Sequence, residues 1–363
     1  MYNWDYYTRR IRRRFIELMK KIIYIAALAA LTACSTMEQP QDGLRPDPNG
    51  KVLKATVIST FDGWNIDSPQ QLVKQQNLLV VNNYTASKSL SSVDLSLNQR
   101  TDRITRSGEN EEAYYISALD ASSGKEYTAL NFRTGQLYVT PMDQAEGNPY
   151  SIQLPADAQH LIAAKAENFV ISTGLYEQGR YLFYCLDDHS ANYYLSYPEH
   201  PQHPDMSERT KSILYASSVL RLRPDAKAFV CSDIHSGLLD ICRIEGNRIE
   251  RVKQQCFYHP RIRVYGSTPQ NTYIAYDRSS IQGFLDIAVS NEHIYVLYSG
   301  KSTQKDRYNI FQCRTLLTFD WEGTLLSSEE LEVPATNIAY DKSEKALYGI
   351  GYTPDATLVR YNL

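Results

Sequence analysis

The chain has 363 residues, of which 43% are hydrophobic and 22% are charged, with a formal net charge of −3. This is the balance of a globular protein that can bury a sizeable core. The lack of a basic excess argues against a nucleic-acid partner.

Residues 19–34 are predicted to be a secretory signal that ends in a lipidation site. Lys20 and Lys21 supply the positive start, residues 22–31 supply the apolar core, and small residues precede the cleavage point. A core of about ten residues is too short to span a hydrocarbon layer of roughly 30 Å. Leu31-Thr-Ala-Cys34 resembles the lipobox of bacterial lipoproteins, which implies acylation of Cys34. Several acyl chains anchor a protein far more firmly than one.

Residues 1–18 contain five arginines ahead of Met19. We expect translation to begin at Met19, or the first 18 residues to form an overlong basic start of the signal. Residues 1–33 are removed in either case. The remaining chain has 31 basic and 39 acidic residues, a net charge of −8, which argues against nucleic acids and anionic lipid surfaces as partners.

Residues 34–50 are predicted to be a lipidated tether, because residues 35–50 are rich in Gln, Pro, Asp, Gly and Asn. Ser35 directly follows the lipidated cysteine. By resemblance to lipoprotein sorting in Gram-negative bacteria, the lack of Asp at this position favours the outer membrane over the inner one. The side of the membrane on which the domain lies, periplasmic or exterior, stays open.

Residues 51–363 alternate short apolar runs with polar turns, and no long amphipathic helix pattern occurs among them. This predicts one all-β domain of four-stranded antiparallel blades. We expect residues 52–58 to complete the last blade beside residues 357–361, because ring closure removes open sheet edges. The strands predicted for blades one to four cover residues 71–73, 77–81 and 90–97; 113–118, 127–132, 136–141 and 150–154; 161–163, 169–172, 181–185 and 193–197; and 218–222, 229–232, 238–243 and 247–253.

The C-terminal third holds a repeat. Asp286-Ile-Ala-Val-Ser, a polar turn and Ile294-Tyr-Val-Leu-Tyr match Asn337-Ile-Ala-Tyr-Asp, a polar turn and Ala346-Leu-Tyr-Gly-Ile. A strand–turn–strand unit that recurs about every 50 residues is typical of β-propeller blades. A mature chain of about 330 residues, at about 55 residues a blade, predicts six blades, with five or seven as alternatives.

Several of these segments carry a family resemblance. Ile294-Tyr-Val-Leu-Tyr-Ser-Gly-Lys301, Leu317-Thr-Phe-Asp-Trp-Glu-Gly323, Ile338-Ala-Tyr-Asp341 and Leu358-Val-Arg-Tyr-Asn-Leu363 resemble the TolB-like six-bladed propeller lipoproteins of Bacteroidetes. The turn Pro224-Asp-Ala-Lys227 is also similar to a turn common in such blades. The resemblance implies a six-bladed propeller tethered to an envelope membrane. It supplies no catalytic motif.

Tyrosine is over-represented, with 28 residues against 3 tryptophans. Tyr rings suit half-buried strand faces, and a stacking platform for a sugar or peptide is the alternative. Trp64, in the loop Phe61-Asp-Gly-Trp-Asn65, is a candidate for a binding rim at the propeller funnel.

Two polar clusters could join that rim. The segment between Tyr197 and Asp205 holds imidazoles and carboxylates that could ligate a transition metal, but its prolines keep it extended and no partner lies at a fixed spacing. The sequence Asp187-Asp-His189 follows a strand and could perform acid–base chemistry. Polar residues at the end of a strand more often form a simple turn. We predict a binding rim without a metal, a cofactor or catalytic residues, formed with Trp64 by Asp187, Asp188, His189, Glu199, His200, His203 and Asp205.

Apart from Cys34, the cysteines are Cys185, Cys231, Cys242, Cys256 and Cys313. An odd number at irregular spacing does not describe a full disulfide framework, and apolar neighbours favour buried free thiols. If Ser236 and Gly237 alone form the hairpin loop, Cys231 faces Cys242 and a disulfide is an alternative.

Motifs for zinc hydrolysis, for a serine nucleophile and for phosphate binding do not occur in this sequence. We therefore predict a membrane-anchored envelope lipoprotein whose propeller is a non-catalytic module that binds a protein, peptide or glycan. The alternatives are a hydrolase or lyase that acts on glycans at the funnel, and a scaffold of an envelope complex.

Overall fold

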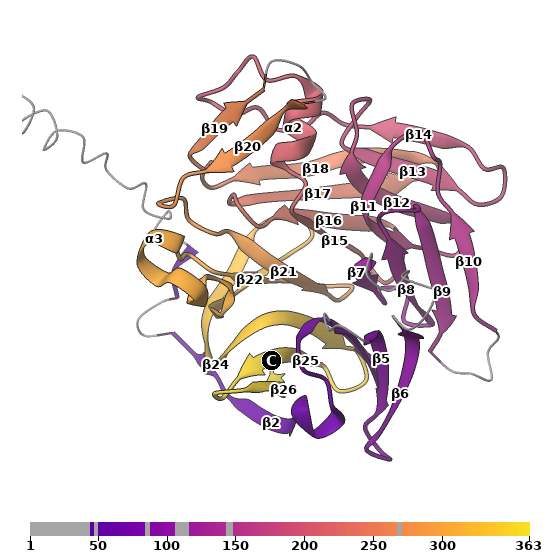
Figure 1. Ribbon diagram of the computed structural model, residues 1–363, viewed down its shortest axis with the longest axis vertical. Coiled ribbons are helices and arrows are strands. Elements are labelled where there is room, and N and C mark those ends of the chain that lie inside the picture. Colours follow the sequence, from indigo (N-terminus) through magenta and orange to yellow (C-terminus); the bar gives the residue numbers. More distant parts are fainter. Residues whose placement is uncertain (1–43, 47–49, 84–87, 106–115, 143–147, 267–270) are drawn as a thin grey trace, which may run out of the picture. The chain divides into compact units, whose positions relative to one another are not determined.

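The computed structural model describes residues 44–46, 50–83, 88–105, 116–142, 148–266 and 271–363. Their strands form blades around a ring (Figure 1). In each blade the first strand lies innermost, and it contacts the first strand of the next blade, from β3 through β7, β11, β15, β21 and β24 back to β3. The predicted all-β propeller is confirmed.

Each of the six blades has four antiparallel strands, as predicted. Blade one is β3 (Pro69–Gln75), β4 (Leu78–Asn83), β5 (Lys88–Asp94) and β6 (Gln99–Thr105); blade two is β7 (Ile116–Asp120), β8 (Glu126–Asn131), β9 (Gln136–Pro141) and β10 (Tyr150–Gln153); blade three is β11 (Gln159–Lys165), β12 (Phe169–Leu175), β13 (Tyr181–Cys185) and β14 (Ala191–Tyr194). Blade four is β15 (Ser218–Leu222), β16 (Ala228–Asp233), β17 (Leu238–Glu245) and β18 (Arg248–Cys256). Blade five is β21 (Phe284–Val289), β22 (Ile294–Tyr298), β23 (Cys313–Phe319) and the first part of β24 (Leu325–Asp341); blade six is the second part of β24, β25 (Ala346–Tyr352), β26 (Ala356–Asn362) and β2 (Ala55–Thr60).

The N-terminal strand closes the ring. β2 pairs antiparallel with β26, from Ala55 opposite Tyr361 to Thr60 opposite Thr357. The short β1 (Val52–Leu53) pairs parallel with β24 at Glu330 and Leu331. The two ends of the described domain therefore share blade six, which confirms the predicted closure.

The core lies between neighbouring blades, where sheets pack face to face. All residues of β13 and β22 are buried, because a strand in the middle of a packed blade is covered on both faces. Such strands are continuous apolar runs in the sequence, and the predicted bounds of β13 agree with the observed ones.

Blade one differs from the prediction at its edge. The strand predicted to end at Leu97 ends at Asp94, whose Oδ1 accepts hydrogen bonds from the N–H groups of Ser96 (2.9 Å) and Leu97 (3.2 Å) in a tight turn. The sequence Gln-Arg-Thr-Asp-Arg-Ile-Thr then forms β6, which was not predicted. An outermost strand needs no apolar run, since one face of it stays in water.

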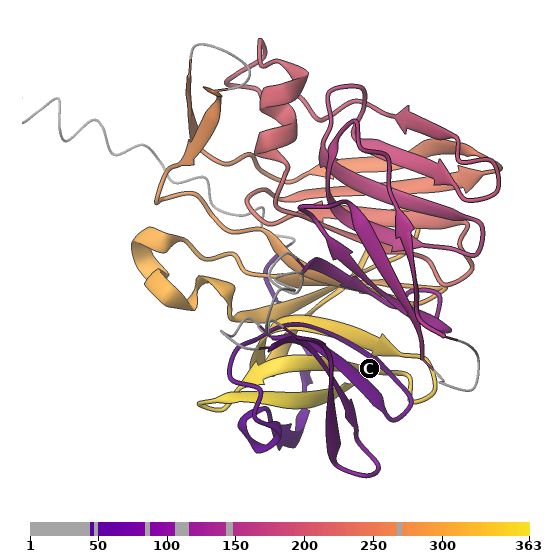
Figure 2. The ribbon, with the colours of Figure 1, turned by 45° about the vertical axis from the view of Figure 1, so that its right-hand side comes forward.

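Two insertions interrupt the regular blades. The first lies between blades four and five and contains the hairpin of β19 (Ile262–Tyr265) and β20 (Tyr273–Tyr276). The second lies inside blade five and contains α3 (Thr303–Asp306) and η6 (Arg307–Phe311). The helix α2 (Glu208–Leu214) lies in the connection between blades three and four. A further short helix, η2 (Asp62–Trp64), follows β2. Figures 1 and 2 show α3 and the β19–β20 hairpin on the same side of the ring. Within the described ranges, every helix is too short or too polar to cross a membrane.

Polar side chains connect the inner strands around the ring. Asn337 of β24 accepts a hydrogen bond from the N–H of Leu72 in β3 (2.8 Å) and donates one to Asp286 of β21. Asp286 also accepts from the N–H of Ile338 (2.8 Å) and from Arg221 of β15 (3.1 Å). These bonds link blades four, five, six and one in a place where little water could replace them.

Gln71 and Ser117 extend the same pattern into blades two and three. Gln71 of β3 donates to the carbonyl of Ser117 (3.2 Å) and accepts from the N–H of Leu119 (3.1 Å) in β7. Ser117 donates to the carbonyl of Leu161 in β11 (2.6 Å). Side chains therefore bridge five of the six contacts between inner strands.

We predict that Asn337→Ala lowers the free energy of unfolding by about 2–4 kcal/mol. The change leaves the N–H of Leu72 buried without its partner and removes one of the two hydrogen bonds that Asp286 Oδ2 accepts. Urea denaturation measures the loss. The control Asn291→Ala removes the same side chain from an exposed turn of blade five and should stay within about 0.5 kcal/mol of the wild type. Equal stabilities of the two variants would contradict a supporting role for the ring of hydrogen bonds.

Candidate functional site

A cavity of about 670 Å³ lies at the carboxyl ends of the inner strands. Because all inner strands run in the same direction around the ring, their last residues and the following turns meet at one mouth. The lining residues come from five blades and include Lys74 to Gln76, Asp120 to Lys125, Arg221, Pro224, Asp225, Ile287 to Glu292, Ile338 to Ser343 and Lys345. Its volume is in the range of small-molecule and peptide sites.

Arg221 is a buried cation in the wall of this cavity. Its Nε donates to the carbonyl of Ile287 (3.0 Å), its Nη1 to the carbonyl of Leu220 (3.1 Å) and its Nη2 to Asp286 (3.1 Å). Burial raises the pKa of Asp286, and the charge of Arg221 opposes that rise. Arg221 is thus held in place by blade five, with its charge balanced by Asp286.

Asp120, at the end of β7, is a buried carboxyl group in the cavity wall. It accepts hydrogen bonds from the hydroxyl (2.5 Å) and the N–H (3.2 Å) of Ser122 in its own turn. Burial raises the pKa of Asp120, and the charge of Arg221 acts against this. Asp120 can therefore accept a hydrogen bond from a ligand or, when protonated, donate one.

Lys74 lies on the other side of the mouth, where it is paired with acids of blade six. Its ammonium group forms an ion pair with Asp341, lies 3.1 Å from Glu344 and sits 4.0 Å above the ring of Tyr348. Burial would raise the pKa of Asp341, but the hydrogen bond from Lys74 keeps it below its usual value. This cluster joins blade one to blade six at the mouth.

The described lining of the cavity includes serines but neither histidine nor cysteine. The hydroxyls of Ser122 and Ser343 donate to the carboxylates of Asp120 and Asp341, and not to an imidazole base. The deepest charges of the cavity are already paired, while Lys125, Lys342 and Lys345 are exposed at the mouth. Sequence reasoning did not find this site, although a charge within an apolar strand, as in Leu220-Arg221-Leu222, could have indicated it.

The predicted rim residues do not line this cavity. Trp64 is 5% exposed, packs edge-on against Phe61 and donates from its indole to Asn98 (2.6 Å), so it belongs to the core between blades six and one. Cys34 lies outside the described residues. The expectation that Trp64 is an accessible rim residue is therefore corrected, because the η2 turn directs its ring inwards.

Asp187, Asp188 and His189 are exposed in the turn between β13 and β14. The N–H of Ser190 donates to Asp188 (3.0 Å), and hydrogen bonds from Ser190 lower the pKa of Asp188 to about 2. His189 Nδ1 lies 3.1 Å from the hydroxyl of Tyr184. The turn joins the two outer strands of blade three, away from the inner strands that line the cavity.

The segment from Tyr197 to Asp205 leads into α2 and packs against the first insertion. Glu199 pairs with Lys211 of α2 (2.6 Å), and Asp205 is exposed. His200 is 1% exposed and bonds through Nε2 to the carbonyl of Pro260 (3.0 Å). The rings of His203 and His259 each lie 5.2 Å from that of His200. Within the ranges that the structure describes, no group of three His, Cys, Asp or Glu residues is arranged to hold a metal ion.

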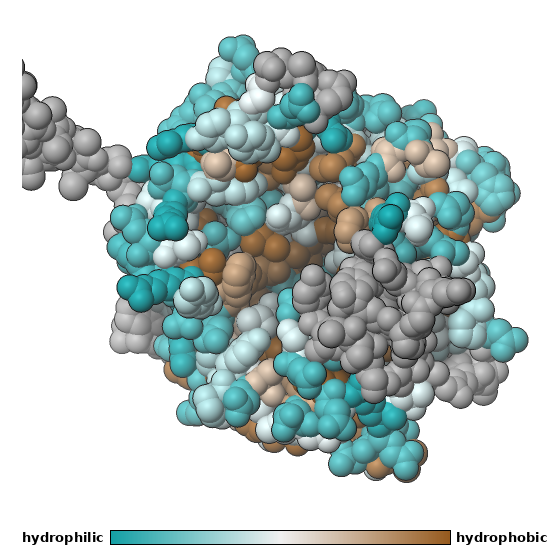
Figure 3. Space-filling view, in the orientation of Figure 1, coloured by the Kyte–Doolittle hydropathy of each residue, from teal (hydrophilic) through white to brown (hydrophobic). Residues whose placement is uncertain are grey.

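We predicted from the sequence that these clusters share one rim, but the structure does not bring them together. The segment 197–205 is covered by the first insertion, whereas residues 187–189 lie at the outer edge of blade three. A role of either cluster in binding stays a prediction. On the face of the molecule drawn in Figure 3, apolar residues line a hollow over β21 and hydrophilic residues border it.

The five described cysteines are free thiols. The hairpin register places Cys231 opposite Asp240, and Cys242 opposite Phe229. The loop of this hairpin is longer than Ser236 and Gly237, because β16 ends at Asp233 and β17 begins at Leu238. The expectation that Cys231 faces Cys242 is therefore wrong, and so is the alternative of a disulfide between them.

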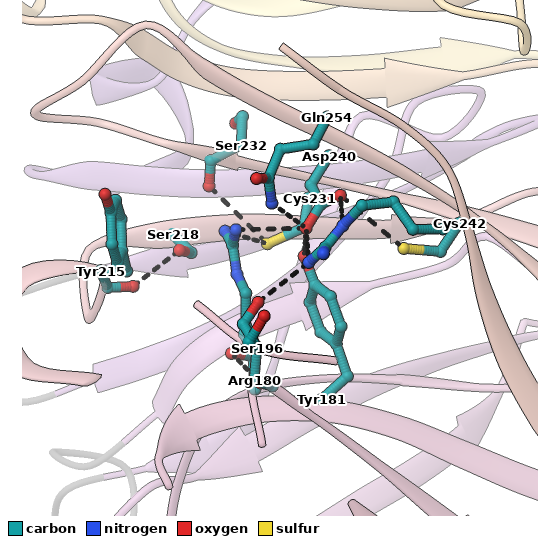
Figure 4. Close-up of polar contacts among 12 residues, drawn as sticks. Arg180, Tyr181, Ser196, Tyr215, Ser218, Cys231, Ser232, Asp240, Cys242 and Gln254 are labelled. Carbon is teal, nitrogen blue, oxygen red and sulfur yellow. Dashed lines mark hydrogen bonds and ion pairs between the residues drawn. The ribbon is translucent and has the colours of Figure 1, made fainter. Parts of the chain in front are cut away.

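Asp240 is the centre of a closed polar cluster between blades three and four (Figure 4). Its fully buried carboxylate accepts from Arg180 Nη1 (3.2 Å), from the hydroxyl of Tyr181 (2.8 Å) and from Arg251 Nε (2.8 Å). Arg180 is fully buried as well, and its Nη2 lies 3.6 Å from the sulfur of Cys231. With no exposed atom at its centre, this cluster fixes two blades to each other.

Asp233 is a second buried acid of blade four. Its Oδ1 accepts from the N–H of His235 (3.1 Å) and the hydroxyl of Ser236 (2.8 Å), whereas its Oδ2 has no partner within the described residues. Burial raises the pKa of Asp233 to about 7, although the charge of Arg180 opposes the rise. The folded protein therefore holds this proton at a pH where the unfolded chain has released it.

We predict that Asp233→Asn changes how stability depends on pH. Because the pKa rises from 3.8 to about 7 on folding, the wild type loses stability on the order of 4 kcal/mol from this group as the pH rises from about 4 to about 7. The variant has no such proton, so its free energy of unfolding rises relative to that of the wild type over this pH range. Urea denaturation at pH values of about 4, 6 and 8 measures the difference. Parallel profiles, like those expected for exposed Asp355→Asn, would refute it.

Comparison with known proteins gives the family. The family model described as TolB-like 6-blade propeller-like matches residues 47–341. No curated protein matches the chain significantly. Among solved structures, the chain is similar to a structural genomics protein of unknown function from Bacteroides thetaiotaomicron, with 10% identity and a TM-score of 0.50 over 86% of this chain and 76% of that one.

Two further similar structures are a streptogramin B lyase (13% identity, TM-score 0.47, 86% of this chain and 98% of that one) and the Pan2 WD40 domain of Neurospora crassa (11%, 0.46, 82% and 78%). At these identities the likeness concerns the propeller fold alone. The family model, in contrast, covers well over half of the chain and includes the inner strands of all six blades. The protein belongs to the TolB-like six-bladed propeller family.

Proposed function

We propose that the protein is an outer-membrane lipoprotein, anchored through acylated Cys34, whose propeller binds a peptide segment of an envelope protein. The lipobox-like sequence before Cys34 and the polar stretch that follows it support the anchor. Resemblance to lipoproteins of Bacteroidetes supports the envelope location.

The observation that carries the binding function is the cavity at the carboxyl ends of the inner strands. Five blades contribute turns to it, so a ligand there contacts many backbone groups at once. Its inner charges, such as Arg221 and Lys74, are paired with acids of neighbouring blades and hold the wall in shape. A wall that is already rigid loses little conformational entropy when a ligand binds.

A peptide fits this wall better than a glycan. Lys125, Lys342 and Lys345 surround the mouth together with Asp225 and Glu292, which suits the mixed charges of a peptide. Sugars usually stack on exposed aromatic rings, and Tyr340 is the one aromatic residue among the described lining residues. Its ring is itself stacked on Tyr295 at 5.6 Å.

One observation favours a second function, a hydrolase or lyase that acts on a glycan. The raised pKa of Asp120 would suit a proton donor in the cavity. Asp341 and Asp225, which could act with it, are bound to Lys74 and Arg223. Asp120→Asn distinguishes the two functions, because it would abolish turnover but only weaken peptide binding.

We predict that Cys34→Ala abolishes acylation and releases the protein from membranes. Metabolic labelling with an alkyne fatty acid, followed by membrane fractionation, measures both effects. The control Cys256→Ala changes a half-buried thiol of the propeller and should keep label and location. Label that persists in Cys34→Ala would refute the anchor. Protease treatment of intact cells then identifies the membrane face.

We predict that the cavity mouth contacts the partner in living cells. A photo-crosslinking amino acid at position 342 should capture a discrete envelope protein, whereas the same group at Leu97, an exposed turn of blade one, should not. A synthetic peptide from the captured segment should bind the wild type about tenfold more tightly than the double variant Lys125→Glu with Lys342→Glu, since such rim charges contribute about 1.4 kcal/mol together.

The control for this measurement is Arg243→Glu with Arg248→Glu, which makes the same charge change on exposed positions of the outer strands of blade four. It should leave the affinity unchanged. Equal effects of the two double variants, or crosslinks at Leu97 alone, would place the binding surface elsewhere.

A further inference from the structure

Both insertions that accompany blade five carry large apolar side chains in contact with solvent. Tyr308 and Phe311 of η6 are 94% and 49% exposed. Tyr265 and Tyr273, at facing positions of the β19–β20 hairpin, are 39% and 59% exposed, and their rings stack at 5.0 Å. Val264, which precedes Tyr265 in β19 and lies opposite Ile274, is 37% exposed. Elsewhere in the described chain, such side chains occur mostly singly.

The same insertions are basic, although the chain is acidic. Residues 261–282 and 301–314 contain seven basic and two acidic residues, a net charge of +5. Arg263, Lys305 and Arg307 are exposed, and no described ion pair involves them. Residues 34–363 have a net charge of −8, but this charge is unevenly distributed and the two insertions are basic. The net charge of the chain therefore does not exclude an anionic surface as a partner of the insertions.

The two insertions are joined by hydrogen bonds at the amino end of β21. The N–H of Gln282 donates to the carbonyl of Lys301 (2.8 Å), and the N–H of Gln304 donates to that of Arg278 (2.9 Å). Ile281 forms a bridge with Ser302, directly before α3. The exposed aromatic and basic side chains of both insertions thus belong to one part of the surface.

Leu44 fixes the start of the described chain at this same place. Its side chain is fully buried in a cluster with Tyr258, Ile281 and Tyr298. Nine residues lie between Cys34 and Leu44, and the ten steps that join them span at most about 35 Å when fully extended. An acyl group on Cys34 consequently keeps the bilayer within about this distance of Leu44.

We propose that this part of the surface, the aromatic–basic face, rests on an anionic phospholipid bilayer. The face consists of Arg263, Tyr265, Tyr273, Lys305, Arg307, Tyr308 and Phe311. Aromatic rings settle at the boundary between headgroups and acyl chains, and Lys and Arg attract anionic headgroups. The proposal rests on the proposed acylation of Cys34, because the tether brings the face to the membrane.

The test uses the acylated protein in vesicles of phosphatidylethanolamine and phosphatidylglycerol, with a nitroxide quencher at the top of the acyl chains. Tyr308→Trp places a fluorophore on the face, and Leu97→Trp places one on a distant exposed turn. The described native tryptophans, Trp64 and Trp321, are buried. We expect strong quenching at position 308, little at position 97, and little at either in vesicles without the quencher.

Charge reversal separates the bilayer from other occupants. Arg263→Glu, Lys305→Glu and Arg307→Glu together should reduce quenching at position 308 to the level at position 97, whereas Lys227→Glu, Arg243→Glu and Arg248→Glu should not. Equal quenching at positions 308 and 97 would overturn the proposal and leave the face to a protein partner. Failure of the anchor is recognised separately, because the wild type would then lack acyl mass and would not float with the vesicles.

Discussion

Asp286 is the group on which the ring depends most. Its carboxylate is buried, and it can stay there only because Arg221 of blade four balances its charge and Asn337 and Ile338 of blade six donate to it. Removal of one partner would leave a buried charge or polar atom unpaired, which is far more costly than the loss of an exposed ion pair. Three blades are therefore held in one arrangement by a single side chain, and the cavity wall beside Arg221 takes its shape from this arrangement.

The contact between Asp286 and Asn337 corresponds to the C-terminal repeat in the sequence. Asp286 and Asn337 occupy the same position in the two matching units, and the structure shows that they bond to each other. The blade number, the ring closure and the buried middle strands could be predicted because blade packing demands continuous apolar runs. Strand β6 could not, since a polar edge strand has the same composition as a loop. A charge inside an apolar run, Arg221 between Leu220 and Leu222, was the available sign of the cavity.

The rim was harder to predict than the fold. His200 stands among prolines, which indicate an exposed loop, yet the first insertion covers it and Pro260 supplies its hydrogen bond. Trp64 stands in a polar loop, yet a short helical turn directs it into the core. In both cases residues far away in the sequence decide the burial. Local composition carries no information on such contacts. The apolar strands could be predicted because the packing of blades buries them, and buried strands appear as apolar runs in the sequence.

Strand β21 relates the two surfaces to which roles are proposed. Ile281, which shares a buried cluster with Leu44, lies three residues before its amino end, and Val289 to Glu292 at its carboxyl end line the cavity. A six-residue strand spans roughly 20 Å, so the Leu44 cluster and the cavity mouth lie near opposite ends of the same inner strand. If the aromatic–basic face rests on the bilayer, the mouth is directed away from it. The membrane then does not block the cavity, and a partner can reach Lys125 and Lys342 from the aqueous side.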